Sequence, residues 1–167
     1  MSGQGEIVMR EAVREQDSEA VREILASSGF FYEQEIVVAQ ELVAERLAKG
    51  PASGYHFVIA EAAGSPHPLG FACFGPIALT DSSYDLFWIA VHEQARHGGV
   101  GSLLLAQCER RVAEMGGSRV YIETSSRPLY EPTRAFYLKR GYRLEATLVD
   151  FYGPGDGKVI FVKALRR

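Results

Sequence analysis

The segment Val91-His92-Glu93-Gln94-Ala95-Arg96-His97-Gly98-Gly99-Val100-Gly101 joins a predicted strand to a predicted helix, and it decides the fold. The strand before it is Leu86–Val91, and the helix after it runs from Val100 to Met115. Glycines leave backbone N–H groups uncovered, and a helix N-terminus carries about half a positive elementary charge. The segment therefore predicts a loop that binds an anion, above all a phosphate. The alternative is a glycine-rich turn that only connects two elements.

Size and composition fit one soluble domain over residues 1–167. The chain is 47% hydrophobic and 23% charged, which is ordinary for a globular protein. Its net charge of −3 argues against a nucleic-acid partner, because such surfaces usually carry a basic excess. No apolar run approaches the roughly 20 residues of a membrane helix, and no apolar signal region follows Met1. We expect no nucleic-acid or membrane partner.

The two cysteines, Cys73 and Cys108, lie in apolar stretches. They are typical of small core residues in a reducing compartment rather than of a disulfide framework. The sequence thus predicts a cytoplasmic protein. The four histidines have no spacing typical of a metal site, so we expect no metal.

Hydrophobic periodicity and turn residues predict a regular succession of strands and helices. Asp17 is expected to cap the first helix. The predicted strands are 6–10, 55–61, 69–75, 85–91, 119–124, 142–151 and 158–165, and the predicted helices are 17–28, 34–49, 100–115 and one that begins near Pro132 and ends at Gly141.

The resulting order is β-α-α-β-β-β-α-β-α-β-β. The strand–helix–strand unit in the middle needs a crossover, so its two strands should be parallel, and the hairpins on either side should be antiparallel. The expected fold class is α/β (α+β), with a mixed, mostly antiparallel seven-stranded sheet and helices on both faces.

Two motifs carry a resemblance to a known family. Arg96-His97-Gly98-Gly99-Val100-Gly101 matches an Arg/Gln-x-x-Gly-x-Gly/Ala signature, and it follows a strand that ends Trp88-Ile89-Ala90-Val91. Downstream, Ala135-Phe136-Tyr137-Leu138-Lys139-Arg140-Gly141-Tyr142 is similar to an aromatic-Tyr-x-x-x-Gly-aromatic segment. With both motifs in this order, the chain resembles the GCN5-related N-acetyltransferase (GNAT) superfamily from Ile7 to about Leu165.

The resemblance implies that acetyl-CoA is the acetyl donor. Its pyrophosphate would bind the 96–101 loop, and its pantetheine arm would pair with the strand edge at 89–91. The chain departs from the family where His97 replaces a frequent glycine, where Gly98 replaces a frequent basic residue, and where Tyr130 stands near a frequent Asn. The implied cofactor-binding residues are Ile89, Ala90, Val91, Arg96, His97, Gly98, Gly99, Val100, Gly101, Ser102, Tyr130 and Phe136.

The chemistry needs a base, because an alkylamine with a pKa of about 10 is mostly protonated near neutral pH. Asp85 matches the position of a glutamate base in some family members; alternatively it is a strand-start residue that meets solvent. Glu123 is the second candidate, unless it only forms a salt bridge. Tyr137 matches the position of the family's general acid, and we expect it to face the cofactor while Phe136 faces the core.

The acceptor site is predicted from aromatic side chains at Phe30, Phe31, Tyr32, Trp88 and Tyr152. The 30–32 stretch could instead be a lid over the core. An aromatic wall beside acidic residues suits a small cationic amine.

The sequence therefore predicts an acetyl-CoA-dependent N-acetyltransferase that acts on the primary amine of a small molecule by direct attack. The alternatives are a protein or peptide N-terminal or lysine acetyltransferase, and a non-catalytic acyl-CoA-binding module. A homodimer is left open, because exposed edge strands in this fold often pair.

Overall fold

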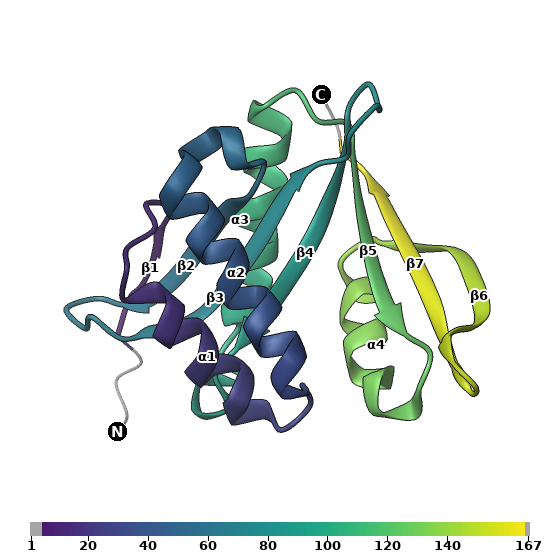
Figure 1. Ribbon diagram of the computed structural model, residues 1–167, viewed down its shortest axis with the longest axis horizontal. Coiled ribbons are helices and arrows are strands. Elements are labelled where there is room, and N and C mark those ends of the chain that lie inside the picture. The colour runs from purple at the N-terminus through teal and green to yellow at the C-terminus, as the bar shows by residue number, and fades with distance from the viewer. Residues whose placement is uncertain (1–4, 166–167) are drawn as a thin grey trace. The chain divides into compact units, whose positions relative to one another are not determined.

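The computed structural model describes residues 5–165 (Figure 1). The order of elements agrees with the order predicted from the sequence. The elements are β1 (Ile7–Arg10), α1 (Asp17–Ser28), α2 (Glu33–Lys49), the 3-10 helix η1 (Gly50–Ser53), β2 (His56–Ala62), β3 (Pro68–Pro76), β4 (Ser83–Val91), the 3-10 helix η2 (Glu93–Ala95), α3 (Val100–Glu114), β5 (Arg119–Ser125), the 3-10 helix η3 (Pro128–Tyr130), α4 (Glu131–Lys139), β6 (Arg143–Gly153) and β7 (Asp156–Ala164).

The seven strands form one mixed sheet in the order β1-β2-β3-β4-β5-β7-β6. The pairings β1–β2, β2–β3, β5–β7 and β6–β7 are antiparallel. β4 and β5 are parallel, as the crossover through α3 predicts. Their register runs from Ser83 opposite Arg119 to Leu86 opposite Ile122, whereas β4 continues to Val91 and β5 to Ser125.

The chain divides into two compact units. Unit 1 contains residues 1–75 and 88–110, and unit 2 contains residues 76–87 and 111–167. β4 and α3 contribute residues to both units. The organisation as a single domain stays a prediction.

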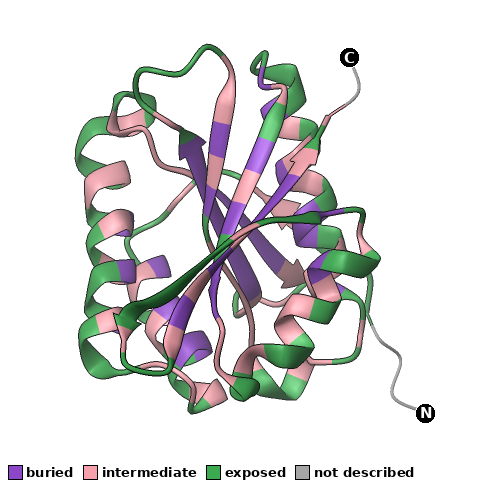
Figure 2. Cartoon of the chain, turned by 90° about the vertical axis from the view of Figure 1, so that its right-hand side faces the viewer, coloured by how far each residue is buried: buried purple, intermediate pink, exposed green. Residues whose placement is uncertain are grey.

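In unit 1, helices lie on both faces of the strands. Buried residues of α1 and α2 pack against one face, which carries Phe57, Phe71 and Cys73. On the other face Gly70 lets α3 approach closely, since a Cβ at Gly70 would lie 3.1 Å from Leu104 Cδ1 and 2.8 Å from the Ala90 carbonyl oxygen. Figure 2 shows the buried segments running along the strands.

Both cysteines are free and buried, as predicted. Burial raises the pKa of the Cys73 and Cys108 thiols. A thiol held protonated is a poor nucleophile, so neither sulfur is a candidate for covalent catalysis.

A buried charge network ties β1 to α1 in unit 1. Arg10 donates to both carboxylate oxygens of Asp17 at 2.8 and 2.9 Å and to Glu61 at 2.6 Å. Asp17 also accepts the backbone N–H of Arg14 at 2.7 Å and is only 3% exposed. The prediction that Asp17 caps α1 was wrong: Asp17 is the first residue of the helix, and its carboxylate turns back to Arg10.

In unit 2, α4 covers the face of β5 and β7 that carries Ile122 and Phe161, which lie opposite each other in the ladder. The ring of Tyr137 in α4 lies 5.9 Å from the rings of Phe161 and Tyr142. All four side chains are buried. This leaves the opposite face of β5, with Tyr121 and Glu123, for other contacts.

Candidate active site

The predicted anion loop has the backbone of a binding site. His92 precedes η2, and its Nδ1 accepts the N–H of Gln94 at 3.1 Å. Arg96 is extended, and His97 and Gly99 follow with φ of 65° and 81°. Within residues 5–165 the N–H groups of His97, Gly98 and Gly99 donate to no protein acceptor. The helix geometry also leaves the first N–H groups of α3 without an intrahelical acceptor, so the loop presents several donors to one anion.

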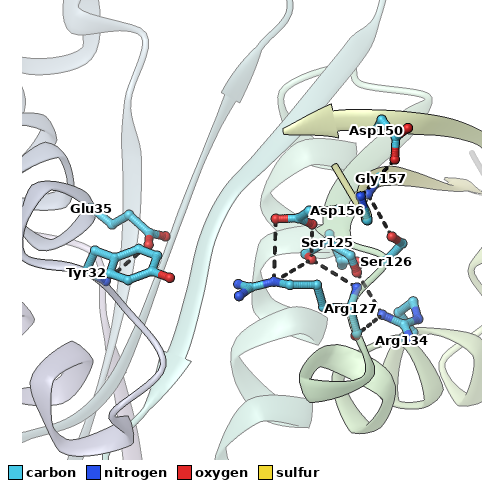
Figure 3. A network of polar contacts seen from close by, with 11 residues as sticks. Tyr32, Glu35, Ser125, Ser126, Arg127, Arg134, Asp150, Asp156 and Gly157 are labelled. Atoms are coloured by element: carbon cyan, nitrogen blue, oxygen red, sulfur yellow. Dashed lines mark hydrogen bonds and ion pairs between the residues drawn. The ribbon is translucent and has the colours of Figure 1, made fainter. Parts of the chain in front are cut away.

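Three of the predicted aromatic residues contact the anion loop or the core of unit 1. The guanidinium of Arg96, the first residue of the 96–101 loop, lies 5.4 Å from the centre of the Phe30 ring. This cation–π contact positions the positive charge of the loop. Phe31 packs edge-on against Trp88 with ring centres 5.4 Å apart, and both pack against the core under α1 and α2. Of the two interpretations of this aromatic stretch, Phe31 fits the lid over the core. Tyr32 is 64% exposed, and its N–H donates to Glu35 at the start of α2 (Figure 3).

His97 adopts a left-handed conformation that glycine tolerates best. For other L-residues this conformation costs about 1–2 kcal/mol, and glycine adds entropy to the unfolded chain. We expect His97→Gly to raise the free energy of unfolding by about 0.5–1 kcal/mol in urea titrations. His92→Gly is the matched control. It should lower stability, because His92 has a negative φ and its ring binds the N–H of Gln94. A loss for both variants would contradict strain at His97.

Unit 2 places the two candidate bases on one face of the sheet. Asp85 lies opposite Tyr121 in the parallel ladder, so Asp85 and Glu123 point to the same side. Glu123 forms an ion pair with Lys158, with Nζ 3.0 Å from Oε1. Within residues 5–165 the carboxylate of Asp85 makes no hydrogen bond or ion pair.

The pKa of Asp85 is raised from its ordinary value of 3.8. Partial burial is the main cause, because it disfavours the charged form. The negative charge of Glu123 adds to the rise, and the positive charge of Lys158 opposes it. A half-buried carboxylate without a partner and with a raised proton affinity has the properties of a general base.

The hairpin β6–β7 completes this face. Phe151 and Tyr152 are 53% and 52% exposed, and their rings lie 5.1 Å apart, edge to face. The Lys158 Nζ lies 4.4 Å from the Phe151 ring centre. Partial burial and the negative charge of Glu123 raise the pKa of Tyr152. Tyr152, which the sequence predicts to bind the acceptor, therefore lies near the Glu123 carboxylate.

The prediction that Phe136 is the core residue of the pair Phe136 and Tyr137 was wrong. Tyr137 is the buried residue of the pair at 4% exposure, whereas Phe136 is only partly buried under the guanidinium of Arg140, 3.7 Å away. Because Ile122 and Glu123 are adjacent in β5, Tyr137 lies on the face opposite the carboxylates. The catalytic role of Tyr137 stays a prediction.

A polar network fixes the loop between β5 and α4 (Figure 3). Ser125 donates to Asp156 and accepts the backbone N–H of Arg127 at 3.1 Å. Arg134 donates to the carbonyl oxygens of Ser125 and Arg127 at 2.7 and 3.0 Å. Tyr130 precedes α4, with its ring 5.5 Å from the Arg127 guanidinium. The network holds Tyr130 in place.

Sequence reasoning missed Lys158 and the pair of Arg127 and Asp156, which are 3.5 Å apart. Lys158 reaches Glu123 diagonally, because Ser125 is its direct partner in the ladder. Only the register of β5 against β7 reveals this contact. Among the described residues no group of three or more His, Cys, Asp or Glu side chains could hold a metal ion, and no helix is long and apolar enough to cross a membrane.

Comparisons with known proteins agree with this fold. The family model "Acetyltransferase (GNAT) family" matches residues 18–142. A crystal structure described as a GNAT-family acetyltransferase from Desulfovibrio desulfuricans is 42% identical, with a TM-score of 0.93 over 96% of this chain and 100% of that one. The chain therefore belongs to the GNAT acetyltransferase family. It is an N-acetyltransferase, and acetyl-CoA is its acetyl donor.

More distant structures share the fold. The aminoglycoside 6'-N-acetyltransferase from Enterococcus faecium is 19% identical, with a TM-score of 0.73 over 96% of this chain and 98% of that one. Ard1 from Thermoplasma volcanium is 23% identical, with a TM-score of 0.75 over 96% and 99%. No curated protein sequence matches the chain.

Proposed function

We propose that the protein transfers the acetyl group of acetyl-CoA to the primary amine of a small molecule by direct attack. Asp85 carries this proposal, because it is half-buried and makes no ion pair or hydrogen bond within residues 5–165. Leaving a carboxylate unpartnered in partial burial costs free energy. An acceptor ammonium would supply the missing partner, and the carboxylate would accept its proton.

The other proposed roles rest on the contacts of each residue or, for Tyr137, on its matching the position of the family's general acid. The N–H groups of His97–Gly101, with Arg96 held against Phe30, would bind the pyrophosphate of the donor. Acetyl-CoA supplies the thioester whose carbonyl carbon the amine attacks, and a strand N–H at 89–91 would stabilise charge on the carbonyl oxygen. Tyr137 would donate a proton to the leaving thiolate. Glu123 is the less favoured base, because Lys158 already neutralises it.

A homodimer is a separate proposal. Edge strand β6 supports it, because Leu144 and Val149 are 56% and 81% exposed there.

The proposed function is tested by incubating the protein with acetyl-CoA and a panel of small amines, following release of free thiol. We expect release that depends on the amine, with one acetyl group added to the acceptor by mass spectrometry. Release with a peptide amine alone would favour the protein or peptide acetyltransferase. Binding of acetyl-CoA without release for any acceptor would favour the non-catalytic acyl-CoA-binding module.

A further inference from the structure

Two ion pairs neutralise charged side chains near Asp85 in unit 2. Glu123 is paired with Lys158, and Arg127 is paired with Asp156. Asp85 remains as the carboxylate without an ion-pair partner within residues 5–165. Asp85 is therefore the carboxylate of this group that an acceptor ammonium can pair with.

Lys158 disfavours binding of an acceptor that brings a second positive charge to this face of unit 2. Its side chain is only 16% exposed, and it is held between the Glu123 carboxylate at 3.0 Å and the Phe151 ring at 4.4 Å. An ammonium fixed in this way cannot move far into solvent when another cation approaches. A second ammonium on the acceptor would meet like-charge repulsion in a partly desolvated setting.

Aromatic side chains also lie on this face. Phe87 follows Asp85 by two residues on β4, so the two side chains share a side, and Phe87 is 39% exposed. Phe151 and Tyr152 are each about half exposed. Exposed aromatic side chains beside one carboxylate suit a ligand with one ammonium group and an apolar body.

From the unpartnered carboxylate of Asp85 and the fixed ammonium of Lys158, we infer that the acceptor is an amine with a single positive charge and an apolar or aromatic body. We also infer that Lys158 is the residue that selects against diamines and polyamines. The inference rests on the proposed function for the identity of the site. It goes beyond that function by excluding polycationic acceptors and by assigning Lys158 a role in specificity.

The test compares kcat/KM for 2-phenylethylamine and hexylamine with kcat/KM for putrescine, spermidine and kanamycin, by thiol release. We expect the monoamines to be preferred by at least about tenfold, which corresponds to about 1.4 kcal/mol. Lys158→Met removes the charge and keeps most of the side-chain length. We expect this variant to raise kcat/KM for putrescine relative to hexylamine by about tenfold or more. Glu123→Gln leaves Lys158 unpaired and should move the same ratio in the opposite direction.

Lys139→Met is the matched control, because Lys139 is an exposed residue at the end of α4. It should leave the ratio unchanged, and thermal melts of all variants show whether they are folded. A wild-type preference for putrescine or spermidine, or an unchanged ratio in folded Lys158→Met, would overturn the inference.

Binding of the same amines, measured by calorimetry with coenzyme A present, separates this inference from the proposed function. Selective binding of monoamines without thiol release would reject catalysis and uphold the charge selection. Absence of both binding and release would reject both.

Discussion

Arg10→Met is expected to lower the free energy of unfolding by about 3–5 kcal/mol, the cost of removing one partner of a buried ion pair. Asp17 is 3% exposed and would lose both hydrogen bonds from the guanidinium, keeping only the N–H of Arg14. Glu61 would lose its bond to Arg10 at 2.6 Å. The raised pKa of Arg10, caused first by its bond to Asp17, agrees with this dependence.

Urea titration followed by fluorescence measures this loss in unit 1, because Trp88 is the chain's one tryptophan and belongs to that unit. The matched control is Lys49→Met, which removes an exposed pair with Glu45 on α2. Pairs of this kind contribute about 0.3–0.5 kcal/mol. Similar losses for the two variants would contradict a structural role specific to the Arg10 network.

Local patterns predicted the elements of this fold well. Periodicity identified each strand and α-helix, because the pattern of buried residues repeats over short stretches of sequence. In β5 buried residues alternate, and in α3 they follow helical spacing. The parallel pairing of β4 and β5 also followed from the chain itself, since only a crossover can connect them.

The errors occurred where a distant residue decides the outcome. Asp17 has the sequence context of a helix cap, but Arg10 and a neighbouring N–H compete for its carboxylate. In α4, Phe136 and Tyr137 both fit a core, and the rotation of the helix against Phe161 selects Tyr137. Neither choice can be read from local sequence.

The candidate site was predictable where local sequence determines it, and not where distant residues do. The donors of the 96–101 loop are backbone groups set by glycines and a helix start, so the motif itself describes them. The pairing of Glu123 with Lys158 depends on the register of β5 against β7, which local sequence does not show. From the sequence, Asp85 was the first candidate base and Glu123 the second, but the sequence did not show that Lys158 neutralises Glu123.

Asp85→Asn is expected to lower kcat/KM for the acceptor amine by about 10²–10⁴-fold, the usual contribution of a general base. The amide keeps the shape of the side chain but cannot accept the proton. The raised pKa of Asp85 means that the fold disfavours its charged form, so ionised Asp85 costs stability at neutral pH. The Asn variant should therefore be at least as stable as the wild type, and lost activity would not reflect unfolding.

The pH dependence of activity gives an independent check on Asp85 as the base. A base must be deprotonated, so activity rises with pH through the pKa of Asp85, and this limb should lie above 3.8. Removing the negative charge in Glu123→Gln should move the limb to lower pH, and removing the positive charge in Lys158→Met should move it to higher pH. The limb should stay in place when amines of different basicity are compared, because it belongs to the enzyme.

Two comparisons decide between Asp85 and Glu123 as the base. Glu123→Gln should reduce turnover less than Asp85→Asn, because Glu123 is already bound to Lys158. Asp81→Asn changes an exposed carboxylate before β4 and should have no effect. Calorimetry should give the same affinity for coenzyme A in all three variants, since the proposed anion loop lies at residues 96–101. A larger loss of turnover in Glu123→Gln than in Asp85→Asn would move the base to Glu123, and the ion pair with Lys158 would then have to open before each turnover.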